Sequence, residues 1–318
     1  MSSETSKRQI TILGHEIERG KEQVIEMEVA KLHNGNNLKI PVIINSALED
    51  GPTLLLMGGV HGDEINGVAI VRDIIRQGYN KPKKGTIICI PVFNAFGYLN
   101  LKREFPDGRD LNRVFPGSSK GSLASQFAYK FTHEIAPFVD YVLDFHTGGA
   151  ERSNYPNIRC VLNDEEQMKL AKIFGAPFIV HSSYIPKSIR YTLNKMGKTI
   201  LLFEGGKSFE LDDEVIAAGV AGSLNLMRYL GLQNGSLIHN YETVVINKSK
   251  WIRAPYSGMF QYKVKNGTRV PKKTLLGIIT DPYGEFCKSV FAPFDCYVFG
   301  VNTSPIVHKG DALFHVGE

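Results

Sequence analysis

The sequence predicts an α/β protein with a mainly parallel or mixed sheet flanked by helices, followed by a C-terminal all-β, barrel-like domain. In the first part of the chain, short apolar runs alternate with segments of helical periodicity, which is typical of parallel strands buried on both faces. Beyond about residue 240 this periodicity disappears. Because 318 residues also exceed the usual size of one core, we predict two domains, over residues 1–240 and 241–318.

The first predicted element is a β-hairpin. Residues 24–46 alternate apolar and polar side chains on either side of the turn Asn34-Gly35-Asn36-Asn37, which is the pattern of two half-buried strands. The apolar runs that follow predict strands at residues 53–57, 86–92, 141–145, 160–162 and 199–203. Helices are predicted at residues 65–77, 122–136, 164–174 and 212–230.

The C-terminal part contains an internal repeat. Residues 254–260 match residues 292–298, which lie 38 positions further on, and each copy leads to a turn and an apolar strand. Two similar halves predict a small pseudo-symmetric β-barrel or sandwich. This tail resembles biotinyl/lipoyl-type barrels, whose modified lysine lies on an exposed hairpin beside Met or acidic residues. Lys272 and Lys273 lack such neighbours, so we favour a structural role over a carrier role.

Composition and charge narrow the class of protein. The 37 basic residues are offset by 32 acidic ones, and the net charge of +5 is dispersed along the chain. Without a basic block or a recognition motif, we predict no nucleic-acid partner. The four cysteines show no CxxC spacing, which indicates reduced, buried thiols.

The sequence predicts a soluble, cytoplasmic protein without a membrane partner. Residues 1–7 are polar and lack the apolar core of a signal peptide. No apolar run approaches the roughly 18 residues that are needed to cross a bilayer. The sequence leaves open whether the protein forms a homo-oligomer.

Metal-ligating side chains follow two of the predicted strands. The strand at residues 53–57 runs into a glycine-rich loop that contains His61 and Glu64, and His146 directly follows the strand at residues 141–145. Ligands of α/β sheets collect at the carboxyl ends of strands, so we expect these side chains to lie together. Two His and one carboxylate are a common ligand set of catalytic zinc. The sequence therefore predicts one Zn²⁺ per chain, held by His61, Glu64 and His146.

A third predicted strand ends in a carboxylate. Glu204 follows the strand at residues 199–203 and precedes two glycines. Burying an unpaired carboxylate is costly, so Glu204 needs a function, and that of general base on zinc-activated water supplies one. A Ser or Cys hydrolase fits poorly, because there is no GxSxG motif and no Cys at a glycine-flanked strand end.

A charged loop supplies candidate substrate ligands. Residues 103–117 are too rich in charge, Pro and Gly to form a core element. Guanidinium groups bind carboxylates in a bidentate fashion. We predict that Asn112 and Arg113 bind a substrate carboxylate, and that Arg103 or Arg109 polarises the scissile carbonyl.

Together, these motifs resemble the succinylglutamate desuccinylase/aspartoacylase family, relatives of the zinc carboxypeptidases. The motifs are Gly-Gly-Val-His-Gly-Asp-Glu at residues 58–64, Asp-Leu-Asn-Arg at 110–113, Asp-Phe-His-Thr-Gly-Gly at 144–149 and Glu-Gly-Gly at 204–206. They occur in this order, and the likeness covers about residues 40–318, the β tail included. The resemblance implies a zinc-carboxypeptidase-like fold with the metal ligands and the base named above.

The resemblance also implies a reaction, the hydrolysis of the amide bond of a small N-acyl amino acid. Glu204 would act as the base and return the proton to the amine, while the metal and an arginine stabilise the oxyanion. Arg190 precedes the Glu204 strand in the region where this family often places a substrate arginine. The β tail of such proteins narrows the entrance to the site, which favours small substrates over peptides.

Two other functions stay open. A zinc carboxypeptidase acting on peptides would share the metal site, although an open cleft without the tail would suit it better. A non-catalytic binding protein would keep the fold but lack a ligand or the base, and neither is missing here. The sequence does not distinguish between acyl groups such as acetyl and succinyl, between amino acids, or between zinc and other divalent metals.

Overall fold

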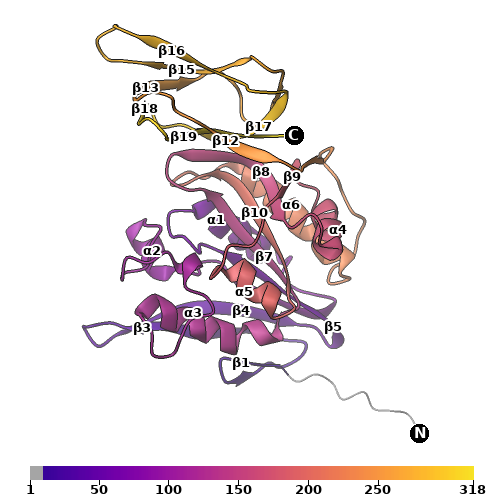
Figure 1. Ribbon diagram of the computed structural model, residues 1–318. Helices are drawn as coiled ribbons and strands as arrows, with labels where there is room; N and C mark the ends of the chain where they lie inside the picture. The colour runs from indigo at the N-terminus through magenta and orange to yellow at the C-terminus, as the bar shows by residue number, and fades with distance from the viewer. Residues whose placement is uncertain (1–9) are drawn as a thin grey trace.

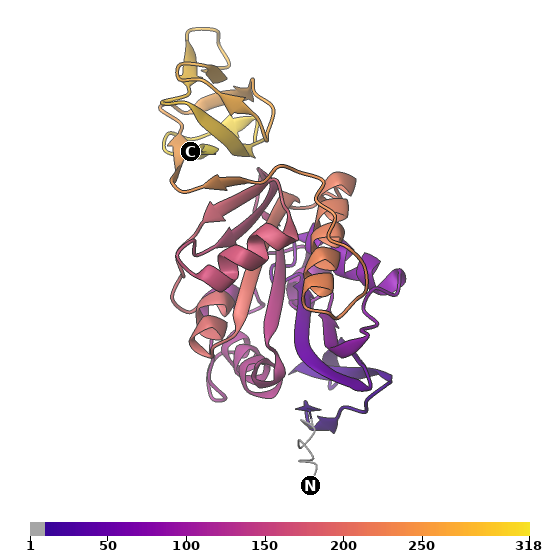
Figure 2. The same ribbon diagram turned by 90° about the vertical axis from the view of Figure 1, so that its right-hand side faces the viewer.

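The computed structural model describes residues 10–318 and has the predicted α/β class. Figure 1 shows helices around a large central sheet and the C-terminal strands stacked at one end of the molecule. In the view of Figure 2, this C-terminal part lies at the opposite end from the first described strands, which are drawn in indigo. Residues 1–7, on which the prediction of no signal peptide rests, lie outside the described residues.

The predicted hairpin and helices of the first part of the chain are confirmed. The strands are β1 (Thr11–Ile12), β2 (His15–Glu16), β3 (Glu22–Lys31), β4 (Asn37–Ser46), β5 (Glu49–Gly58), β6 (Lys84–Ile90), β7 (Tyr141–Gly148), β8 (Arg152–Cys160), β9 (Phe178–His181) and β10 (Thr199–Lys207). The helices are α1 (Ile65–Arg76), α2 (Ala95–Asn100), α3 (Leu123–Glu134), α4 (Glu165–Phe174), α5 (Ile189–Lys195) and α6 (Asp213–Tyr229), with the 3-10 turns η1 (Leu111–Arg113) and η2 (Ala136–Phe138). The hairpin is β3 and β4, and the four predicted helices are α1, α3, α4 and α6.

The large sheet is parallel at its centre. The neighbouring strands β10, β7, β5 and β6 run parallel in this order. β8 pairs antiparallel with β10, β4 pairs antiparallel with β6, and β3 pairs antiparallel with β4. Parallel strands are covered on both faces, which explains their continuous apolar sequences. Because β5, β7 and β10 are adjacent, their carboxyl ends meet at one edge of the sheet.

Helices cover both faces and enclose two apolar cores. On one face α1, α4 and α6 pack over Leu54 and Phe203, and on the other α3 and α5 pack over Leu55 and Ile200. Successive residues of a strand point to opposite faces, so the adjacent Leu54 and Leu55 belong to different cores. Within residues 10–318, no helix has both the length and the apolar character needed to span a membrane.

One predicted strand is wrong in position. The segment 160–162 overlaps β8 only at Cys160, because β8 begins at Arg152 and already ends at Cys160. This strand carries Arg, Ser, Asn and Pro, since part of it lines a cavity, and such a composition is typical of a loop. The helices α2 and α5 and the strand β9 were not predicted, because elements this short show too little periodicity.

The tail is a two-layered β-structure. Its strands are β11 (Val244–Ile246), β12 (Ser249–Arg253), β13 (Gly258–Tyr262), β14 (Arg269–Val270), β15 (Leu275–Thr280), β16 (Cys287–Phe291), β17 (Cys296–Asn302), β18 (Ile306–Val307) and β19 (Ala312–Gly317). One layer contains β12, β19, β17 and β14, and the other contains β16, β15, β13 and β18. Phe260, Val298 and Phe314 share the core of the tail. The two repeats lead into β13 and β17, one in each layer.

The tail shares the large sheet with the first part of the chain. β17 pairs antiparallel with β8, and β11 pairs parallel with β9. Among the described residues, the resulting sheet has 13 strands and runs through both parts. The division at residues 240 and 241 stays a prediction.

All four cysteines are free thiols. Cys89, Cys160 and Cys296 are buried as predicted, and burial raises the pKa of the Cys160 thiol to about 11. The prediction of burial is wrong for Cys287, which is exposed because β16 lies at the edge of its sheet.

His315 is a buried histidine of the tail. Its ring stacks on Trp251 with ring centroids 4.5 Å apart, and its other neighbour is the Phe299 ring at 4.4 Å. Its Nε2 lies 3.1 Å from the Ser249 hydroxyl oxygen. Burial, assisted by the positive charge of Arg159, lowers the pKa of His315 to about 3. The folded tail therefore holds this imidazole in its neutral form.

We expect the protein to lose stability in mild acid because of His315. Below its ordinary pKa of 6.5 the unfolded chain binds a proton that the folded imidazole accepts only near pH 3, so the free energy of unfolding falls across this window. Between about pH 7 and about pH 5, His315 should account for a loss of about 2 kcal/mol. Urea unfolding at both pH values measures the free energy of unfolding of each variant. Between the two pH values, the wild type should lose about 2 kcal/mol more of it than His315→Phe does. The control His33→Gln alters an exposed turn and should lose as much free energy of unfolding as the wild type. Equal losses in the wild type and His315→Phe would contradict the expectation.

Candidate active site

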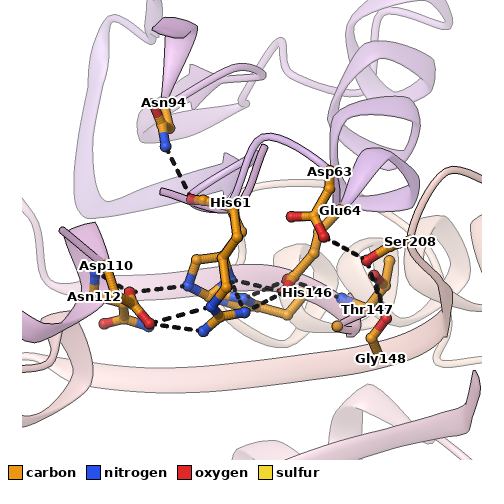
Figure 3. Close-up of polar contacts among 12 residues, drawn as sticks. His61, Asp63, Glu64, Asn94, Asp110, Asn112, His146, Thr147, Gly148 and Ser208 are labelled. Atoms are coloured by element: carbon orange, nitrogen blue, oxygen red, sulfur yellow. Dashed lines mark hydrogen bonds and ion pairs between the residues drawn. The ribbon is translucent and has the colours of Figure 1, made fainter. Parts of the chain in front are cut away.

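The carboxyl ends of three adjacent strands bring the candidate residues together. His61 and Glu64 lie in the turn between β5 and α1, His146 lies near the end of β7, and Glu204 lies in β10. In the parallel pairing of β7 and β10, Glu204 is the Cα partner of His146. Figure 3 shows the side chains of His61, Glu64 and His146 converging on one another.

The turn that carries His61 and Glu64 depends on glycine. A Cβ atom on residue 62 would lie 1.8 Å from the carbonyl carbon of Gly97, so only glycine fits there. Glu64 is the N-cap of α1 but makes no side-chain capping bond. Its carboxylate is instead turned toward the two imidazoles.

The Glu64 carboxylate bridges the two histidines. Its Oε1 lies 2.8 Å from His61 Nδ1, and its Oε2 lies 2.8 Å from His146 Nδ1. One possible ligand atom from each residue lies within 4.8 Å of the others, and all three residues are buried. The amide of Thr147 donates to Oε2 at 3.2 Å, and the Arg103 Nη1 donates to Oε1 at 3.0 Å.

Two aspartates hold the opposite edges of the imidazoles. Asp110 Oδ1 lies 3.3 Å from His61 Nε2, and Asp144 Oδ2 lies 2.9 Å from His146 Nε2. Each Nε2–H can donate to its carboxylate, which leaves each Nδ1 lone pair directed toward Glu64. Such carboxylate–histidine pairs are the usual support of metal-bound imidazoles.

The charges of these groups are strongly coupled. Burial alone would lower the pKa of His146, but Asp144 and Glu64 outweigh it and raise that pKa well above its ordinary value. Burial would also lower the pKa of His61, but Glu64 and Asp110 outweigh it and raise that pKa above its ordinary value. For Glu64, burial would raise the pKa, and the two imidazoles instead hold it well below its usual range. Positive charge is therefore favoured at this point.

The donor set fits a zinc ion. Two imidazole nitrogens and one carboxylate within reach of one point are a ligand set of catalytic zinc. A divalent cation would supply the positive charge that Glu64 requires, in place of the protons on the histidines.

A cavity of about 470 Å³ opens beside these three residues. Arg103, Glu204 and the tail residue Trp251 are among the residues that line it. The Arg103 guanidinium is anchored by Asp110 Oδ2, which accepts from Nη2 at 2.9 Å and from Nε at 3.2 Å. Glu204 accepts a hydrogen bond of 2.8 Å from the Asn154 side chain.

This fold and this site agree with the comparisons to known proteins. The catalytic-domain model of the succinylglutamate desuccinylase/aspartoacylase family matches residues 50–230. The chain belongs to this family. A curated relative, the N-alpha-acetyl-L-2,4-diaminobutyric acid deacetylase of Halomonas elongata, is 29% identical over 254 residues, which are 76% of this chain and 74% of that protein. The relatives thus include deacylating hydrolases of N-acyl amino acids.

Solved structures share this fold over most of the chain. A succinylglutamate desuccinylase/aspartoacylase from Rhodobacter sphaeroides superimposes with a TM-score of 0.82 at 24% identity, covering 93% of this chain and 96% of that one. The product-bound ectoine utilization protein EutE from Ruegeria pomeroyi gives 0.83 at 23% identity, with 93% and 94% covered. An aspartoacylase family protein from Mesorhizobium loti gives 0.81 at 25% identity, with 93% and 94% covered.

Most of the predicted substrate residues of this family member line the cavity. Asn112 and Arg113 lie in η1 at its wall, and Arg190 reaches it from α5. The Asn112 Oδ1 accepts from the Ile189 amide at 2.9 Å, which leaves its Nδ2 group free to donate elsewhere. Arg190 is buried and donates to backbone carbonyls and to the Ser182 hydroxyl.

The structure does not bring Arg109 into the site. Its side chain is exposed, lies 3.5 Å from a carboxylate oxygen of Asp107 and is not among the residues that line the cavity. Of the two arginines predicted to polarise the carbonyl, Arg103 alone lies at the cavity.

Several site residues were not predicted. Asp144 lies two positions before His146, so the two share a face of β7, and an Asp inside an apolar run was a signal for it. Asp110 belongs to the same charged loop as Arg113. The cavity residues Asn154 and Trp251 gave no signal, because they lie on strands whose neighbours depend on the tertiary fold.

We expect Asp144 to set the zinc affinity. Asp144→Asn removes the charge that supports His146, and loss of such a partner typically lowers metal affinity by about 10- to 100-fold. A competition titration of the purified protein with a zinc-chelating dye measures this change. Asp164→Asn, which alters the N-cap of α4 away from the site, should keep the wild-type affinity. Equal affinities for Asp144→Asn and wild type would contradict the role of Asp144.

Proposed function

We propose that this chain is a zinc-dependent amidohydrolase that releases the amino acid from a small N-acyl amino acid. The observation that carries the proposal is the convergence of His61, Glu64 and His146 at the wall of a cavity that Glu204 also lines. Membership of a family that includes N-acyl amino acid deacylases supports the same reaction.

The proposed chemistry divides between the metal and the protein. When bound, a zinc ion supplies Lewis acidity, which makes water more acidic and polarises a carbonyl group. Glu204 accepts the proton of the attacking water and then delivers it to the amine that leaves. Arg103, fixed by Asp110 and Glu64, directs its remaining N–H groups toward the oxygen of the scissile carbonyl.

The substrate carboxylate is bound by Arg113 and Arg190. Arg113 donates to the backbone oxygen of Asn112 at 2.7 Å and makes no ion pair within residues 10–318. Arg190 likewise has only neutral acceptors among the described residues. Arg190 is buried, and a buried cation without a counterion is costly, so its guanidinium favours an anionic ligand. Arg113 is exposed at the cavity wall, where its guanidinium can bind a carboxylate. Nothing in the geometry supports such a role for Arg109.

The volume of the cavity favours small substrates. About 470 Å³ is in the range of pockets for small molecules. The tail contributes Trp251 to its wall, which supports the proposal that the tail narrows the entrance.

The first test measures zinc content and amine release together. We expect about one zinc per chain and release of amino acid from part of a panel of N-acetyl and N-succinyl amino acids, sensitive to a chelator and restored by zinc. Glu204→Gln should bind the same zinc but lose most of its activity, because its amide cannot accept the proton.

Other outcomes decide between the alternatives. Release of C-terminal residues from peptides, without cleavage of N-acyl amino acids, would establish the zinc carboxypeptidase. Binding of zinc and of N-acyl amino acids without turnover would establish a binding protein. Absence of zinc binding would contradict the assignment of His61, Glu64 and His146.

Arg113 should affect substrate binding more than turnover. Arg113→Met removes the guanidinium that faces the substrate carboxylate, so we expect KM to rise by about 10- to 100-fold with a smaller change in kcat. Steady-state kinetics on the best substrate of the panel measure both constants. Arg109→Met is the matched control, because this arginine lies outside the cavity, and it should keep the wild-type constants. An unchanged KM in Arg113→Met would rule out this contact.

A further inference from the structure

We propose that Asn154 is a positioning residue that orients Glu204, and that the C-terminal tail holds Asn154 in place through Gly300. The inference rests on the proposed function of Glu204 as general base. It adds a second role to the tail, which then acts on the base as well as covering the cavity.

Glu204 lies where the sheet is irregular. The register of β10 with β7 shifts between Glu204 and Lys207, and its register with β8 shifts between Glu204 and Gly206. Such bulges interrupt the ladder of hydrogen bonds and redirect side chains. The backbone alone therefore fixes the direction of the Glu204 carboxylate less firmly than a regular strand would.

Asn154 supplies the missing constraint. Its buried side chain donates from Nδ2 to Glu204 Oε2 at 2.8 Å, which is the hydrogen bond that reaches this carboxylate among residues 10–318. The Arg159 Nε forms an ion pair with Oε1 at 3.6 Å, which is longer than a hydrogen bond and less directional. A neutral donor to an ionised acceptor is stronger than an ordinary hydrogen bond. Its loss should therefore leave the carboxylate with the longer ion pair to Arg159 and a less defined orientation.

The tail packs directly against Asn154. Gly300 of β17 is the Cα partner of Asn154 in the antiparallel pairing with β8. A Cβ atom on residue 300 would lie 3.1 Å from Asn154 Oδ1 and 2.9 Å from His315 Cβ. Asn154 Oδ1 thus lies beside the space that a side chain at residue 300 would fill, while Nδ2 faces Glu204.

The contacts run across three neighbouring strands. β17, β8 and β10 are adjacent in the sheet and carry Gly300, Asn154 and Glu204 respectively. On the far side of Gly300, the tail is held by the stack of His315 on Trp251. A shift of the tail would therefore reach the base through one amide group.

Asn154→Leu tests the hydrogen bond with a side chain of similar shape that cannot donate. We expect kcat to fall by about 10- to 100-fold with KM changed by less than about two-fold, because the bond orients the base and does not bind the substrate. Zinc content should equal that of the wild type. Glu204→Gln, measured beside it, gives the loss expected when the base itself is removed.

Gly300→Ala tests the contribution of the tail without altering a cavity residue. Its methyl group should displace Asn154 and lower kcat by several-fold, with KM and zinc content unchanged. In the Asn154→Leu background the same substitution should have no further effect on kcat, because both changes act on one hydrogen bond. Asn302→Leu is the matched control. Within residues 10–318 the Asn302 side chain bonds to Ala312 and Ser304 of the tail alone, so this substitution should lower stability and leave kcat unchanged.

The outcomes separate this inference from the proposed function. Wild-type kcat in Asn154→Leu beside an inactive Glu204→Gln overturns the inference and leaves the proposed function standing. Activity in Glu204→Gln contradicts the base and the inference together. Independent falls of kcat in the double variant overturn the role of the tail.

A structural readout decides the case in which no tested amide is cleaved. Crystal structures of wild type, Asn154→Leu and Gly300→Ala should then show the Glu204 carboxylate in one conformation in the wild type and displaced in both variants. An unchanged Glu204 conformation in the variants overturns the inference without any measurement of activity.

Discussion

The burial of the Glu64 carboxylate is the constraint on which the rest of the site depends. A carboxylate that is removed from water needs positive charge or donors around it. Here His61, His146, Arg103 and the Thr147 amide all contact its two oxygens. These groups come from three parts of the chain: the turn after β5, the strand β7 and the charged loop. The site therefore forms only when all three are in place.

Opposite charges also surround the positive groups that contact Glu64. The positive groups around Glu64 are themselves held by carboxylates, Asp110 for His61 and Arg103, and Asp144 for His146. Asp110 also caps η1 by accepting from the Asn112 amide at 2.8 Å. One aspartate therefore ties His61 and Arg103 to the turn that carries Asn112 and Arg113, and a change in the loop would affect both.

The sequence predicts the parts of this structure whose signal is local. Continuous apolar strands and glycines after them placed His61, Glu64, His146 and Glu204 at one edge of a sheet, because parallel strands end at the same edge. The position of β8 was missed because its polar residues serve a cavity, and a cavity exists only in the tertiary fold. Which arginine of the charged loop faces the site was equally undetermined, since Arg103 and Arg109 differ only in the carboxylates that the folded loop places beside them.

The position of the tail follows from the same sheet and not from a separate interface. An added domain that covers a cavity by surface contact alone can tilt, because interfaces of modest area permit relative motion. β17 instead extends the sheet by hydrogen bonding to β8, so tilting the tail would break backbone hydrogen bonds. Trp251, which lines the cavity, is held by its stack on His315 within that continuous sheet. Trp251 of the cavity wall and the strand beside Glu204 are therefore parts of one continuous sheet, and the shape of the site depends on residues far along the chain from His61, Glu64 and His146.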